Sequence, residues 1–178
     1  MATAAEPILM TVEQYHAAPP CADVITELHW GQVVTLTRPK MKHAKLQSRL
    51  IRLLRPKAEH LGVVESEVAF RALAEYDLRG ADVAFVSRER WDATSDDDNL
   101  RGSPELVIEV LSPSDTKREM HEKATLYLAT GAHEFWIVDA KQKNVTVVRR
   151  EGSVVYEIGQ LIPLALFGGD LSAANIFA

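Results

Sequence analysis

The sequence has few of the features that mark a secreted, disulfide-bonded or membrane-spanning protein. Cys21 is the only cysteine, so the chain can form neither a disulfide framework nor a cysteine metal cluster. No stretch approaches the roughly 18 uninterrupted apolar residues that a membrane span needs. The first residues lack the basic start of a signal peptide. We therefore expect a cytoplasmic protein without membrane contacts.

Two further absences limit how the chain can handle phosphate groups. It has no glycine-rich loop of the kind that cradles nucleotide phosphates, which argues against hydrolysis of a small phosphorylated molecule. Its net charge of −5 argues weakly against a protein that coats nucleic acid by charge alone. With 178 residues, 47% of them apolar, the chain is long enough to bury a core, and residues 1–178 predict a single domain.

One segment nevertheless lacks negative charge altogether. Between Arg38 and Lys57 there are eight Lys or Arg and no Asp or Glu. Helical periodicity over residues 42–60 places four leucines on one side and a row of cations on the flank. The row consists of Lys42, Lys45, Arg49, Arg52 and Arg55. A solvated surface helix and a track for a polyanion such as DNA are both compatible with this pattern.

The remaining pattern alternates between helix and strand and predicts an α/β (α+β) domain with a mixed central sheet. Thr11 and Gln14 form a capping box, and residues 24–37 read as a hairpin that turns at Trp30 and Gly31. Strands are expected within 62–73, 81–87, 104–111, 133–140, 144–150 and 153–159, and residues 91–103 as a polar loop. A helix opened by the segment Ser112–Ser114 should end at Gly131, and a last helical turn should follow Ser172.

Lys123 lies in the middle of the apolar stripe of that helix. An unpaired buried ammonium would lose its charge, so this position needs an anion nearby. Glu109, in the apolar strand PELVIEV, and Asp82, at the start of ADVAFV, are the candidates. The alternatives are a structural ion pair between Lys123 and Glu109, and a turn role for Asp82. Two carboxylates and a lysine at strand ends are also the composition of a metal-dependent phosphodiesterase site.

Several motifs carry a resemblance to a known family. These are MTVEQY, ITELHWGQVV, GADVAFVSRERW, VIEVLSPSD and EKATLYLATGAHEFWIVDA, which together span nearly the whole chain. The sequence resembles the bacterial family of putative restriction endonucleases, within the PD-(D/E)xK nuclease superfamily. Ala81 stands where the superfamily has proline, and Leu111 stands where it usually has lysine. Lys123 matches branches in which the lysine has moved to the following helix.

The resemblance implies a restriction endonuclease-like core and Mg²⁺-dependent hydrolysis of DNA, with Mn²⁺ able to substitute. Asp82, Glu109 and the Val110 carbonyl would hold the metal. Lys123 would orient or deprotonate the attacking water, or stabilise the transition state. Glu27 would position waters or complete a second site. His43 is an active-site candidate and equally a core histidine.

The expected partners are DNA and a second copy of the chain in a homodimer. A different class of function stays open at this point, because fold does not fix function. The same fold could serve as a noncatalytic homodimeric module that binds nucleic acid or protein. Retention of Asp82, Glu109 and Lys123 together favours the enzyme.

Overall fold

The structure is a computed structural model that describes residues 9–19 and 24–178. Its centre is a mixed sheet of seven strands in the order β5-β3-β4-β6-β7-β8-β9. The strands are β3 (Gly62–Arg71), β4 (Arg79–Ser87), β5 (Leu100–Arg101), β6 (Leu106–Val110), β7 (Glu134–Asp139), β8 (Asn144–Arg149) and β9 (Gly152–Glu157). β6 runs parallel to β7 and β3 runs parallel to β5, whereas the other neighbours are antiparallel. This sheet confirms the predicted fold class.

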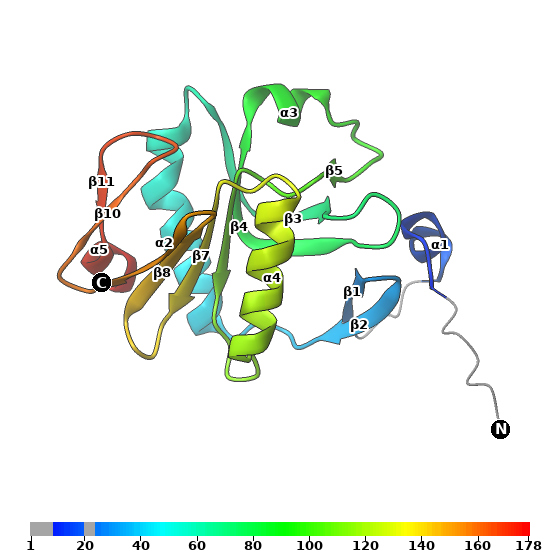
Figure 1. Cartoon of the computed structure of the whole chain (residues 1–178), viewed down its shortest axis with the longest axis horizontal. Helices are drawn as coiled ribbons and strands as arrows, with labels where there is room; N and C mark the ends of the chain where they lie inside the picture. The colour runs from blue at the N-terminus through cyan, green and yellow to red at the C-terminus, as the bar shows by residue number, and fades with distance from the viewer. Residues whose placement is uncertain (1–8, 20–23) are drawn as a thin grey trace.

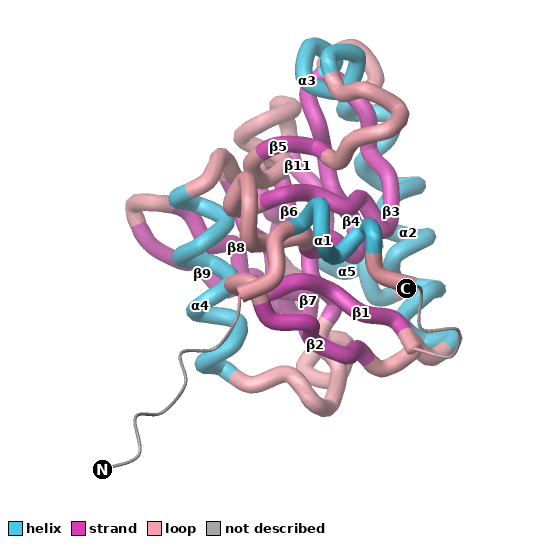
Figure 2. The backbone as a smooth tube through the Cα atoms, turned by 90° about the vertical axis from the view of Figure 1, so that its right-hand side faces the viewer, coloured by secondary structure: helices cyan, strands magenta, loops and turns pink. Residues whose placement is uncertain are grey.

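Helices cover both faces of the sheet (Figure 1). α2 (Met41–Ala58) and α5 (Ala173–Phe177) pack against one face, and α4 (Lys117–Ala129) packs against the other. Figure 2 shows α2 and α4 on opposite sides of the strands. β4 and β6 lie between these layers, and four apolar residues of β6 are buried. Strands covered on both faces read as continuous apolar runs, which is the pattern in the sequence.

The apolar stripe of α2 explains why the basic segment forms a helix. Leu46, Leu50 and Leu54 recur at helical spacing and are at most 6% exposed. They pack into the same core as Val83 and Ile108 of the sheet. The cations of the segment are thereby left at the flank and on the outer side of the helix.

The start of α4 differs from the prediction. We expected serine at 112 or 114 to open the helix, but the N-cap is Thr116 and the first helical residue is Lys117. The Thr116 side chain accepts from the Glu119 backbone N–H, and the Glu119 carboxylate accepts from the Thr116 backbone N–H. This reciprocal capping box satisfies two backbone groups. Ser112 instead lies in a turn before the helix, where its backbone N–H donates to the Asp115 carboxylate.

A separate hairpin, β1 (Ile25–His29) and β2 (Gln32–Leu36), lies beside the sheet, next to α1 (Val12–Ala17) (Figure 2). Its turn has positive φ at Trp30 (53°) and Gly31 (76°), as a two-residue primed turn requires. A bridge between Leu28 and Leu78 fixes the hairpin to the segment that leads into β4. The predicted hairpin is confirmed, and its attachment brings the acid at position 27 toward β4.

The elements that the sequence did not predict are short. They are α3 (Arg88–Ala93), β5, β10 (Leu161–Pro163) and β11 (Asp170–Ser172). α3 and β5 occupy part of the expected polar loop. The capped first helix, the hairpin between β8 and β9 and the last helical turn are confirmed. No helix among the described residues is long and apolar enough to cross a membrane.

Candidate functional site

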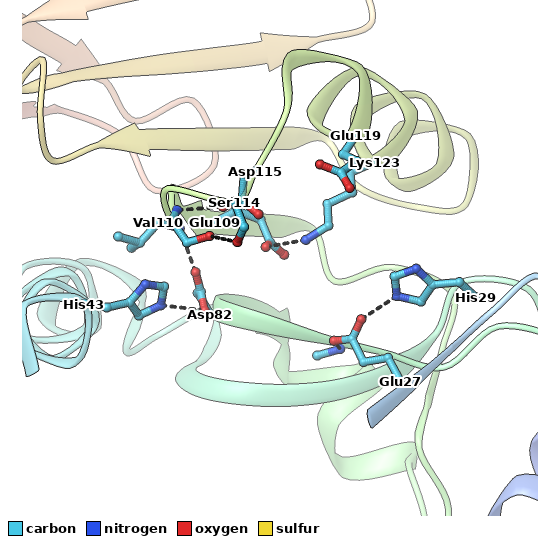
Figure 3. A network of polar contacts seen from close by, with 12 residues as sticks. Glu27, His29, His43, Asp82, Glu109, Val110, Ser114, Asp115, Glu119 and Lys123 are labelled. Carbon is cyan, nitrogen blue, oxygen red and sulfur yellow. Dashed lines mark hydrogen bonds and ion pairs between the residues drawn. The ribbon is translucent and has the colours of Figure 1, made fainter. Parts of the chain in front are cut away.

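The sheet places Asp82 and Glu109 on neighbouring strands. Val83 of β4 pairs with Ile108 of β6 in antiparallel register. Asp82, one residue before Val83, therefore lies beside Glu109, one residue after Ile108. Figure 3 shows Asp82, Glu109 and Lys123 approaching one another from β4, β6 and α4. The three residues that the sequence grouped are therefore grouped in space.

Lys123 forms an ion pair with Glu109. Its Nζ donates to Glu109 Oε2 at 2.6 Å, and the two side chains are 19% and 11% exposed. Burial and the nearby Asp82 carboxylate raise the pKa of Glu109 to about 7, although Lys123 opposes this shift. Burial alone would lower the pKa of Lys123, but the Glu109 carboxylate and other anionic groups raise it above its usual value. Lys123 therefore stays cationic in this site.

Asp82 accepts hydrogen bonds on both carboxylate oxygens. Oδ1 faces His43 Nε2 at 2.9 Å and Gln47 Nε2 at 3.1 Å, both from α2. Oδ2 accepts from the Val110 backbone N–H at 2.7 Å. These contacts fix the carboxylate at the carboxyl end of β6. They also place His43 at the site rather than in the core.

Glu27 reaches the site from the hairpin. Its Oε1 accepts from the Gly80 backbone N–H at 2.7 Å, and its Oε2 lies 2.6 Å from His29 Nε2. Gly80 is two residues before Asp82, so Glu27 borders the same end of β4 (Figure 3). Glu27 thus flanks the group of Asp82, Glu109 and Lys123.

The residues present fit a hard divalent cation that keeps most of its waters. Glu109 Oε1 is buried and has no hydrogen-bond partner among the described residues. Mg²⁺ commonly takes only one or two carboxylates and fills its other positions with water or substrate. Within the described ranges, no three His, Cys, Asp or Glu side chains gather closely enough to form a protein-only metal cage. This open set of donors fits a hydrated hard cation and does not form a closed structural metal site.

Several residues at the site were missed by sequence reasoning. Gln47 is buried, and its Nε2 donates to Glu67 Oε1 at 2.7 Å as well as to Asp82. Glu67 has φ of 54° within β3, an unusual conformation for a residue with a side chain. Tyr127 is buried, and its hydroxyl has no partner among the described residues. Only the spacing of Gln47 four residues after His43 offered a signal.

The predicted row of cations on α2 is divided in the structure. Arg49 donates to the Ile176 carbonyl at 3.2 Å. Arg55 pairs with Glu65 of β3 and also donates to the Val64 carbonyl. Lys42, Lys45 and Arg52 are exposed. The five residues therefore have different surroundings, and the row is not one uniform surface.

The pKa of His43 leads to a prediction about stability. The hydrogen bond to Asp82 raises this pKa despite opposition from burial. A raised folded-state pKa adds stability below the unfolded value, near 6.5, and this contribution is lost as pH rises through the folded value. Wild type should therefore exceed His43→Asn in free energy of unfolding by more at pH 6 than at pH 9.

Urea denaturation at the two pH values measures this difference. His121→Asn, on an exposed position of α4, is the matched control. Equal differences at pH 6 and pH 9 for His43→Asn would show that the contact with Asp82 does not raise the pKa of the imidazole.

The seven-stranded mixed sheet between two helical layers matches the fold of a nuclease-like solved structure. The chain belongs to the family described as putative restriction endonuclease (Uma2), whose model matches residues 12–174. Its fold is similar to the crystal structure of a putative nuclease of DUF820 from Anabaena variabilis ATCC 29413. That match has a TM-score of 0.79 and 18% identity, and it covers 94% of this chain and 97% of the other. No curated protein matches the chain.

Proposed function

We propose that this protein is a divalent-metal-dependent endonuclease that hydrolyses phosphodiester bonds in DNA. The observation that carries the proposal is the pairing of Lys123 with Glu109 beside Asp82, with one Glu109 oxygen buried and without a hydrogen-bond partner in the described structure. A second carboxylate beside the pair, together with burial that raises the pKa of Glu109, is typical of a functional site. The family and the fold add support for a nuclease.

Asp82 and Glu109 would hold Mg²⁺, with the Val110 carbonyl as a proposed third ligand. When bound, the cation would neutralise charge on the phosphate and lower the pKa of a water. Asp82 is already aimed by three donors, so little reorganisation is needed at that carboxylate. Glu109 Oε1, which is buried without a hydrogen-bond partner in the described structure, would gain the cation as a partner.

Lys123 would act as a cation rather than as a base. Its raised pKa keeps the proton on Nζ, and a protonated ammonium cannot accept one from water. Nζ can instead donate toward a phosphate oxygen and oppose the charge that develops in the transition state. Of the roles that the sequence left open for Lys123, we therefore propose stabilisation of the transition state and not deprotonation of the water.

Glu27 and His43 would position other groups. Glu27 is held by Gly80 and His29, and its negative charge adds to the field at Lys123. His43 orients Asp82 through Oδ1. Homodimerisation stays a prediction, and so does a cytoplasmic location, which was inferred from the composition and the first residues of the sequence.

The direct test is a nicking assay on supercoiled plasmid DNA. We expect cleavage with millimolar Mg²⁺ or Mn²⁺ and none after chelation with EDTA. A protein that binds DNA but leaves it intact under every metal condition would instead be the noncatalytic binding module. RNA and single-stranded DNA in parallel reactions define the substrate class.

The position of Gln47 leads to a second expected result. Gln47→Leu removes the donor that Asp82 Oδ1 shares with Glu67, so both acceptors lose a partner. We expect activity or metal affinity to fall by about 10- to 100-fold, as for other partners of metal ligands. The free energy of unfolding should fall by about 1–3 kcal/mol.

Ser48→Ala, at the exposed neighbouring position, is the control for this variant. Metal titration and urea denaturation report the two effects separately. Full activity in Gln47→Leu would remove Gln47 from the site, whatever the change in stability.

A further inference from the structure

A basic groove lies between α2 and the turn that joins β7 to β8. Its volume is about 380 Å³. The lining residues are Met41, Lys42, Lys45, Leu46, Arg49, Ala140, Lys143 and Phe177. Four of them carry a positive charge and none carries a negative charge, in a chain with a net charge of −5. This charge suits an anionic ligand. The other lining residues are apolar.

The cations on the α2 side of the groove, its helical wall, are spaced so that they can contact successive anionic groups. Lys42, Lys45 and Arg49 follow the i, i+3, i+7 pattern, so they project to one side over about 10 Å of helix. One strand of a DNA duplex carries a phosphate for roughly every 3.4 Å along its axis. The wall is therefore long enough for more than one phosphate of one strand. The bond from Arg49 to the Ile176 carbonyl holds the far end of the wall in place.

The opposite wall is formed by Lys143, which no sequence pattern singled out. Lys143 is exposed at the end of the β7–β8 turn, with φ of 57°. Its backbone N–H donates to the Asp139 carbonyl at 2.8 Å. The Asp139 carboxylate accepts from the N–H groups of Lys141 and Gln142, so the acid closest to Lys143 in the sequence is engaged within the turn. Lys143 forms no ion pair with any described residue.

The groove opens at the same end of the sheet as the candidate site. β6 and β7 are parallel, with Val110 paired to Val138, so the turn after β7 lies next to the end of β6. Lys42 precedes His43, whose imidazole contacts Asp82. Figure 1 shows the start of α2 and the β7–β8 turn at the end of the sheet where the chain enters α4. A DNA strand bound beside Asp82 can therefore continue into the groove.

We propose that this groove binds the sugar-phosphate backbone of the DNA strand next to the cleaved phosphodiester, with Lys143 as a phosphate contact. The inference rests on the proposed function and extends it to a second site. Lys42, Lys45 and Arg49 form one wall, and Lys143 forms the other. Arg55, engaged by Glu65 on β3, does not line the groove.

The test compares two lysines of the same turn. Lys143→Gln and Lys141→Gln change the net charge equally, but only Lys143 lines the groove. Binding to a fluorescent DNA duplex is measured by anisotropy in EDTA over a series of salt concentrations. We expect Lys143→Gln to weaken binding and to reduce the slope of log K against log salt by about 1. Lys141→Gln should bind as wild type does.

A second pair on the helix provides an independent comparison. Lys42→Gln should repeat the effect of Lys143→Gln, and Lys57→Gln, at an exposed position in the last turn of α2 outside the groove, should not. Equal behaviour within both pairs, in a protein that still binds and nicks DNA, would overturn the groove and leave the proposed function standing. A wild-type protein that neither binds nor nicks DNA would overturn both.

Discussion

Lys123→Met is expected to lower the rate of DNA nicking by at least about 100-fold, the scale of a lost group that stabilises transition-state charge. The ammonium is the only cation that an ion pair brings to Glu109 in the described structure. Its raised pKa means that it enters the reaction protonated. Removing it therefore removes positive charge and not a base.

Lys123→Arg separates these two roles. Arginine keeps the cation but cannot serve as a base. If Lys123 acts through its charge, Lys123→Arg should retain measurable nicking under conditions in which Lys123→Met has none. If both variants are equally inactive, a role as a simple cation is wrong. Lys117→Ala, exposed at the first helical position of α4, should nick as wild type does.

Stability provides a control for Lys123→Met. Removing one partner of a buried ion pair typically costs about 3–5 kcal/mol, because the other charge is left without compensation. The double variant Glu109→Gln/Lys123→Met removes both charges, so it should recover part of that loss in urea denaturation. It should remain inactive. Recovery of stability without recovery of activity would separate the chemical role of the pair from its structural role.

The contact between Lys123 and Glu109 could be predicted because it depends on two simple periodicities. Helical phase placed Lys123 on the face that packs against the sheet, and the apolar strand left Glu109 as the acid most in need of a partner. The 2.6 Å ion pair agrees with that expectation. The order of elements likewise indicated a mixed sheet between helices.

Other features could not be predicted because they depend on register or on approach between distant segments. Gln47 reaches Asp82 and Glu67 only once α2 has been placed over β3 and β4. Lys143 faces α2 only because the β7–β8 turn lies at the end of the sheet where α2 begins. The start of α4 was misplaced because serine and proline at 112 and 113 mimic a helix opening, whereas Thr116 and Glu119 form the capping box.

Asp82→Asn and Glu109→Gln are both expected to abolish metal-dependent nicking, but they should differ in stability. Asparagine has one acceptor oxygen where Asp82 has two, and both oxygens face donors: His43 and Gln47 on one side, the Val110 N–H on the other. Either orientation of the amide turns its NH₂ toward a donor. We expect a loss of about 1–3 kcal/mol in the free energy of unfolding.

Glu109→Gln removes the anion that compensates the buried Lys123, so it should cost the fold more than Asp82→Asn does, about 3–5 kcal/mol, even though a hydrogen bond can be kept. Glutamine can place its carbonyl oxygen toward Lys123 and its NH₂ at the position of Oε1, which no described donor contacts. Because the pKa of Glu109 is raised from 4.5 to about 7, wild type loses stability as pH rises between these values. The variant lacks this loss, so its free energy of unfolding should rise relative to wild type from pH 5 to pH 7. Urea denaturation across this range, with Mn²⁺ titration for metal affinity, checks both variants. A Glu109→Gln protein that still bound Mn²⁺ as wild type does would remove Glu109 from the metal site.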